Sequence, residues 1–170
     1  MINDIIGQAM GIIATVITFI SYQANTKRSL LIIQSTATVC TCISYLFLGA
    51  SSGFALNIVC LMRNAVFYFQ KEGTRLQYFS AGALALVMAF VGALSWQGPI
   101  SLLIIIALAA NTVFMSFGKP QLLRQSVLVT STMVLIYNIF VFSIGGITNE
   151  GISIISSAIG IVRYRKEKKS

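Results

Sequence analysis

Long apolar stretches run through the whole chain, and charged, glycine, proline and small polar residues interrupt them at regular intervals. Each stretch is close to the about 20 residues that a helix needs to cross a bilayer. Dividing the chain at these interruptions predicts seven spans, at 4–23, 29–49, 52–70, 76–95, 99–117, 121–142 and 145–164. The connections between them are too short for a soluble domain. The pattern therefore predicts an all-α membrane protein with seven transmembrane helices.

The composition supports this class and argues against catalysis. Of the 170 residues, 56% are apolar and 9% are charged, whereas an average soluble domain has about a quarter charged residues. Histidine is absent, and the four acids are scattered along the chain at Asp4, Glu72, Glu150 and Glu167. The chain thus lacks the paired acid and base, or the metal cluster, that most hydrolytic and redox reactions require. We expect no enzyme, no cofactor and no metal site.

The basic residues predict which side of the membrane each connection faces. The formal charge of +8 comes from 12 basic and 4 acidic residues, and positive side chains are retained on the cytoplasmic side. Apart from Arg63, the basic residues lie at alternate junctions and in the tail: Lys27, Arg28, Lys71, Arg75, Lys119, Arg124, Arg163, Arg165, Lys166, Lys168 and Lys169. This pattern predicts an N-terminus outside and a cytoplasmic C-terminus. We expect the basic tail to contact anionic membrane lipid, and no nucleic acid to be bound.

The chain also shows a weak internal repeat. Of the 47 positions from Lys27 to Gly73, 8 carry the same residue as the position 92 further on. The most informative pairs keep the same spacing in both copies: Tyr45 with Tyr137, Gly53 with Gly145, and Asn57 with Asn149. Two copies of three spans in the same orientation require one extra helix between them, and span 4 has that place.

The repeat predicts two parallel three-helix bundles joined by a linker helix. The expected divisions are 1–70 for the first bundle, 71–97 for the linker, 98–164 for the second bundle and 165–170 for the tail. Small residues recur at every fourth position of span 4, at Ala81, Ala85, Ala89 and Ala93. This spacing predicts a ridge on which another helix packs closely.

Polar side chains within the spans are the candidate site residues. Because hydrocarbon leaves a polar group without a partner, such groups tend to face a bundle interior or a wet cavity. The candidates lie on spans 2, 3, 6 and 7: Thr38, Tyr45, Asn57, Arg63, Asn64, Thr130, Tyr137, Asn149 and Ser153. If the bundles face each other, these side chains line a central path rich in neutral hydrogen-bonding groups.

Each candidate also has a purely structural interpretation. Serine and threonine in a membrane helix often bond back to the carbonyl four residues earlier. Asn57 and Asn149 could cap the start of a helix, and Tyr45 and Tyr137 could belong to an interfacial aromatic belt. Arg63 could extend to the cytoplasmic interface, or it could face the cavity and favour an anionic solute.

Several stretches resemble known families. The stretches Gly53–Asn57 and Gly145–Asn149 lie where the third helix of each SWEET bundle has its substrate-binding asparagine, and the layout is similar to that of SWEET and PQ-loop transporters. A closer resemblance is to the YgjV-like family of small bacterial inner-membrane proteins. The stretches that carry it are Ser21–Gln23, Leu30–Gln34, Tyr45–Ala50, Asn57–Ile58 and Arg63–Tyr68.

The resemblance implies a multi-pass protein of the bacterial inner membrane with a transporter-like fold, and it names no solute. One feature departs from the PQ-loop pattern. The Pro-Gln pair that serves there as a hinge is replaced by Tyr22–Gln23 and, in the second copy, by Phe114–Met115. The resemblance therefore does not carry the hinge mechanism to this chain.

We expect a facilitator that moves a small polar solute, such as a sugar or a vitamin-like molecule, by alternating access. Proton-driven transporters generally use buried carboxylates or histidines, and only Glu150 could serve here. The alternative is a non-transporting scaffold or accessory subunit whose helices merely pack. The identity of the solute, coupling to an ion and pairing of two copies into a homo-oligomer stay open.

Overall fold

The computed structural model describes residues 2–21, 27–70, 74–117 and 120–167, and these residues form seven α-helices and no strand. The helices are α1 (Ile2–Ser21), α2 (Lys27–Phe47), α3 (Ser51–Phe69), α4 (Arg75–Leu94), α5 (Ser101–Ser116), α6 (Pro120–Phe140) and α7 (Ile144–Glu167). Each helix lies on one of the seven apolar stretches, with its ends shifted by at most three residues. The predicted all-α, seven-helix fold is therefore confirmed.

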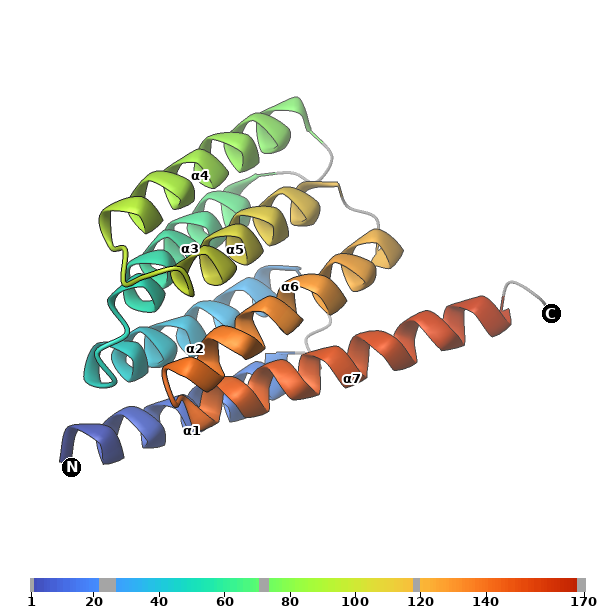
Figure 1. Ribbon diagram of the computed structural model, residues 1–170. Helices are drawn as coiled ribbons and strands as arrows, with labels where there is room; N and C mark the ends of the chain where they lie inside the picture. Colours follow the sequence, from blue (N-terminus) through green and yellow to red (C-terminus); the bar gives the residue numbers. More distant parts are fainter. Residues whose placement is uncertain (1, 22–26, 71–73, 118–119, 168–170) are drawn as a thin grey trace.

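The helices alternate in direction and form two facing rows (Figure 1). One row consists of α1, α2 and α3, the other of α5, α6 and α7, and each helix contacts its neighbour in the row. The rows meet at both edges, where α1 contacts α7 and α3 contacts α5, while α4 lies outside against α3 and α5. The middle helices α2 and α6 thus face each other across the centre. The division into two bundles, a linker and a tail stays a prediction.

The two ends of the molecule differ in their connections. The short turns that join α2 to α3, α4 to α5 and α6 to α7 lie together at one end, called here the turn end. Arg28 and Arg75 lie at the starts of α2 and α4, at the opposite end, called here the basic end, where α7 also finishes. Lys71, Lys119, the Tyr22–Gln23 pair and residues 168–170 lie outside the described residues. Apart from Arg63, which lies within α3, the basic residues of the described ranges therefore lie toward the end opposite the short turns.

The backbone repeats with an offset of 93 residues, and the predicted offset of 92 is wrong by one. The helices α2 and α6 begin at residues 27 and 120 and end at 47 and 140, while α3 and α7 begin at 51 and 144. The turns agree with this offset. The Ala50 N–H donates to the Tyr45 carbonyl at 2.9 Å, and the Ser143 N–H donates to the Asn138 carbonyl at 2.9 Å.

The same offset relates the two residues with positive φ in these turns, Gly49 at 71° and Phe142 at 54°. Asn57 therefore corresponds to Glu150 and not to Asn149. Identical residues at an offset of 92 do not show the true register, because an apolar-rich composition produces such matches by chance. The hydrogen bonds and dihedral angles of the turns fix the register directly.

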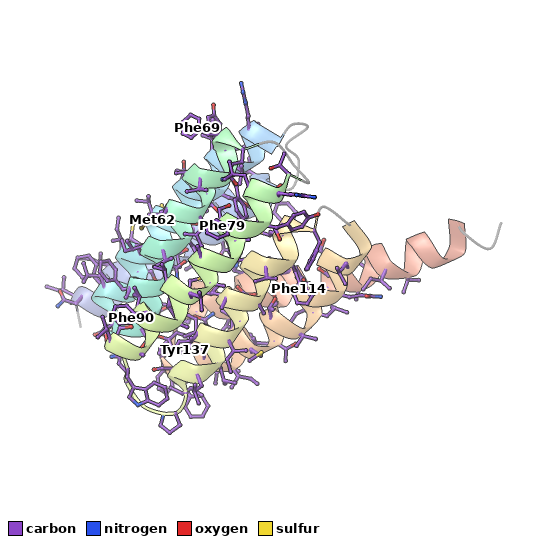
Figure 2. The ribbon with its side chains drawn as sticks, turned by 90° about the horizontal axis from the view of Figure 1, so that it is seen from above. Met62, Phe69, Phe79, Phe90, Phe114 and Tyr137 are labelled. Atoms are coloured by element: carbon purple, nitrogen blue, oxygen red, sulfur yellow. The ribbon has the colours of Figure 1, made fainter. Side chains whose placement is uncertain are left out.

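Large apolar side chains cover the outside of the helices. Figure 2 shows Met62 and Phe69 on α3 and Phe79 and Phe90 on α4 directed away from the bundle, and Phe79 and Phe90 are 77% and 66% exposed. By length and composition, α1, α3 and α4 could each cross a membrane, and α2, α5 and α6 contain shorter apolar stretches. So much exposed apolar surface is typical of a protein that contacts lipid rather than water.

The helix α4 packs through a face that coincides only in part with the predicted alanine ridge. Ala81 is buried and Ala85 is half-buried, but Ala89 and Ala93 are exposed. The buried residues follow spacings of four, three, four and four: Gln77, Ala81, Leu84, Met88 and Gly92. A strict four-residue spacing drifts around a helix of 3.6 residues per turn, so the ridge prediction is wrong beyond Ala81.

Candidate functional site

A polar cavity of about 210 Å³ lies between the two rows. Every helix except α4 contributes to its wall, through Thr18, Gln34, Ala37, Thr38, Thr41, Tyr45, Asn57, Cys60, Arg63, Asn64, Ile104, Leu108, Asn111, Met115, Val134, Asn149 and Glu150. Ligand pockets for drug-sized molecules usually measure about 300–1,000 Å³. At about 210 Å³ the cavity is smaller than this range, so it fits a molecule smaller than a drug-sized one.

Six of the nine predicted site residues line this cavity, namely Thr38, Tyr45, Asn57, Arg63, Asn64 and Asn149. The other three lie outside the lining. Tyr137 and Ser153 are buried, and the Thr130 hydroxyl donates to the Ser126 carbonyl at 3.0 Å. An offset of 92 pairs Thr130 with Thr38, but in the observed register the equivalent of Thr38 is Ser131, and a shift of one residue turns a helical side chain by about 100°.

The two asparagines lie well inside their helices, on opposite sides of the cavity. Asn57 is six residues beyond the start of α3, and Asn149 is five residues beyond the start of α7, so neither caps a helix. The Asn57 amide donates to the Gly53 carbonyl at 2.8 Å, and the Asn149 amide donates to Glu150 Oε1 at 3.1 Å. These bonds use one N–H of each amide, and no other hydrogen bond of either side chain is found among the described residues.

Arg63 is a buried wall residue and does not extend to the interface. Its side chain is 7% exposed and lines the cavity. Nε and Nη2 donate to Asn64 Oδ1 at 3.2 and 3.0 Å, and Nη1 donates to Thr112 Oγ1 at 3.3 Å. All three hydrogen bonds go to neutral oxygens. A positive charge therefore stands in the wall of the cavity with only neutral partners in these bonds.

Five further polar residues line the cavity that the sequence did not single out as site residues: Thr18, Gln34, Thr41, Asn111 and Glu150. Gln34 and Asn111 have no identical residue in the other half, so the repeat does not point to them, although their positions within predicted spans were a usable signal. Glu150 lies six residues beyond the start of α7, and its carboxylate accepts from the Asn149 amide and from Ser131.

Aromatic and amide side chains at the centre close the cavity toward the turn end. The Tyr45 hydroxyl donates to Asn138 Oδ1 at 2.7 Å, and the Gly53 N–H donates to the Tyr137 hydroxyl at 3.0 Å. The two tyrosine rings meet edge to face, with centroids 6.0 Å apart. Because they are 3% and 1% exposed, neither tyrosine belongs to an interfacial belt.

Two glutamines, called here the clamps, tie the halves together at the turn end. Gln97 precedes α5, donates to the Gly49 carbonyl at 2.8 Å and accepts from the Ser52 N–H at 3.1 Å. Gln8 on α1 donates to the Phe142 carbonyl, and it accepts from the first N–H of α7 at 2.8 Å. Gln97 thus binds the turn between α2 and α3, and Gln8 binds the turn between α6 and α7.

The edge where α1 meets α7 depends on two glycines. A Cβ on Gly145 would overlap the backbone of Gly11. The Thr15 hydroxyl donates to the Gly145 carbonyl at 2.8 Å across the same contact. Close backbone approach of this kind is typical of helix pairs in membranes. Together with the clamps, it holds the two rows together at the turn end.

Comparison with known proteins locates the chain in one family and gives no activity. A family model described as "Imp-YgjV: Bacterial inner membrane protein" matches residues 5–168. The resemblance to YgjV-like proteins is therefore confirmed. No curated protein and no solved structure matches the chain significantly. The similarity to SWEET and PQ-loop transporters stays a prediction.

Proposed function

The chain belongs to the Imp-YgjV family of bacterial inner membrane proteins, and from that premise we propose that it is a facilitator of a small polar solute, such as a sugar or a vitamin-like molecule. The observation that supports this most is the cavity between the two halves, into which both Asn57 and Asn149 project polar groups. Transporters built from repeats bind their substrate near the bilayer midplane, at the interface between the repeats. Rocking of one half against the other then exposes the site to each side in turn.

The proposal includes an orientation. With the basic end in the cytoplasm, as retention of positive charge favours, the N-terminus lies outside and all seven helices cross the membrane. The clamps and the tyrosine pair then close the cavity toward the outside. In this interpretation, the structure corresponds to a state in which the solute exchanges with the cytoplasm.

The competing function is a scaffold that does not transport. A scaffold needs only a packed seam of apolar side chains between its halves. The polar wall with a buried arginine disfavours it, because a charged residue inside a membrane protein is costly and usually serves a functional site. The lining also contains no histidine, and its one carboxylate has no paired base, so we propose no enzymatic activity.

The decisive experiment measures flux in proteoliposomes that contain the full-length chain, with labelled sugars, vitamins and amino acids. Asn57→Ala and Asn149→Ala are each expected to abolish uptake of the transported compound, because each removes an amide from one wall of the cavity. Asn3→Ala is the matched control, since Asn3 is exposed at the start of α1. Unchanged flux in both cavity variants would reject the site, provided that size-exclusion profiles show intact protein.

A further inference from the structure

The cavity contains one formally positive and one formally negative side chain, at different depths. Arg63 lies 12 residues beyond the start of α3, and Glu150 lies 6 residues beyond the start of α7. Both helices start at the turn end and run in the same direction (Figure 1). At about 1.5 Å per residue, the Arg63 backbone is about 9 Å further from the turn end than that of Glu150. The negative side chain of the cavity therefore comes from a backbone position nearer the turn end, and the positive side chain comes from a position nearer the basic end.

The Arg63 guanidinium has N–H groups that are not used in hydrogen bonds to other described residues. A guanidinium has five N–H groups, and the hydrogen bonds to Asn64 and Thr112 use three of them. One N–H on each Nη atom remains for a further partner. A buried charge with neutral partners is strongly stabilised by an opposite charge, and a carboxylate fits the planar arrangement of these donors.

The Glu150 carboxylate can accept further hydrogen bonds. The Glu150 carboxylate has about four lone-pair positions, and its described donors are the Asn149 amide and Ser131. Both donors are neutral, so the charge of Glu150 is not compensated by them. An ammonium group in the cavity would be attracted to this carboxylate more strongly than in water, because the surroundings are less polarisable.

We propose that the solute of this cavity is a small zwitterion of the amino-acid type, whose carboxylate binds Arg63 and whose ammonium group faces Glu150. This inference rests on the proposed facilitator function and narrows its solute class. An uncharged sugar would leave both side-chain charges unpaired. A simple carboxylate would be repelled by Glu150, and a simple amine by Arg63. The amides of Gln34, Asn57 and Asn111 line the same cavity and can supply neutral hydrogen bonds to the solute.

The first test is binding, measured by thermal stabilisation of the purified full-length chain. The probes are the twenty natural amino acids, their deaminated carboxylate analogues, and a set of neutral sugars and polyols. At least one amino acid is expected to raise Tm in a saturable way, and its deaminated analogue is expected to bind more weakly. Stabilisation by sugars alone, or by no amino acid, overturns the proposal.

Charge-neutralising variants then assign the two groups. Arg63→Gln is expected to weaken amino-acid binding roughly 10- to 100-fold, which corresponds to loss of a charge-assisted hydrogen bond. Glu150→Gln is expected to change the preference in favour of the deaminated carboxylate, an effect that a merely structural role would not produce. Arg28→Gln, at an exposed position where the guanidinium stacks 5.6 Å above the Tyr68 ring, and Asp4→Asn are the matched controls.

The outcomes separate this inference from the facilitator proposal. Flux of a sugar without binding of any amino acid overturns the zwitterion and leaves the facilitator standing. Binding of an amino acid that depends on Arg63, without flux in proteoliposomes, leaves the site standing and rejects the facilitator. If Arg63→Gln does not fold, Arg63→Lys and the changed preference of Glu150→Gln decide the question. An unchanged preference in Glu150→Gln overturns the assignment of the ammonium group.

Discussion

Tyr45 and Asn138 occupy corresponding positions in the two halves, and their side chains bond to each other across the centre of the molecule. Gly146 packs against this pair so closely that a Cβ there would overlap the Asn138 amide. Asn138 Nδ2 has no hydrogen-bond partner among the described residues. One buried hydrogen bond of 2.7 Å therefore joins these two side chains across the centre.

Asn138→Leu is expected to lower the free energy of unfolding by about 1–3 kcal/mol, because it leaves the buried Tyr45 hydroxyl without its acceptor. Denaturant titration of the purified chain measures the change. The same substitution in a Tyr45→Phe background should cost less, since the hydroxyl is then already absent. Equal costs in both backgrounds would show that the hydrogen bond does not contribute.

At the residue scale, the sequence indicated the kinds of side chain that line the cavity better than it indicated which individual residues line it. Asn57, Asn64 and Arg63 were identified because polar groups inside apolar spans are conspicuous. Thr130 lies outside the cavity lining, and identical residues at an offset of 92 do not occupy equivalent positions in the two halves. Whether Arg63 faced a cavity or the interface depends on its packing against Thr112 of another helix, which no local pattern contains.

At the element scale, the helices themselves could be predicted closely. Apolar length and the residues that interrupt it are local signals, and they located all seven helices of the described chain. The neighbours of each helix could not be predicted in this way. The contact of α1 with α7 joins residues more than 130 positions apart, Gly11 and Gly145, and many glycines in the chain have no such role. Gly82 and Gly151, for example, would meet nothing if they carried a Cβ.

The two glycine environments on α7 give a matched pair of variants. Gly145→Ala is expected to destabilise the chain by about 1–3 kcal/mol, because its methyl group would force α1 and α7 apart. Gly151→Ala on the same helix is expected to be neutral or slightly stabilising, since open space surrounds it and alanine favours a helix. Thermal unfolding in detergent measures both. A similar Tm for the two variants would contradict the proposed close contact.

At the scale of the whole molecule, the clamps are the feature that the proposed alternating-access cycle would have to change. Gln8 binds the turn between α6 and α7, and Gln97 binds the turn between α2 and α3, so a state open at the turn end requires both sets of bonds to break. Loss of these hydrogen bonds should therefore change the equilibrium between the states open and closed at the turn end. It should change the stability of either half less.

Cys60 offers a reporter of this balance, because it lines the cavity and is buried. In a Cys40→Ser, Cys42→Ser background, the double variant Gln8→Leu and Gln97→Leu should increase labelling of Cys60 by a membrane-impermeant maleimide added from outside. The expected increase is several-fold in rate, since each clamp is a hydrogen-bonded pair worth roughly 1 kcal/mol or more. Gln125→Leu, at an exposed position of α6 away from the turn end, is the control. Labelling that stays equal in both variants would contradict the role of the clamps.

The correspondence of Asn57 with Glu150 has a consequence for how such a molecule can be assembled. A homodimer of two identical three-helix chains would have to present the same group twice around its axis, either two amides or two carboxylates. A single polypeptide that contains both halves is free of this symmetry restriction. The unequal charge along the path is therefore a property that covalent joining permits and that self-association of one half could not reproduce.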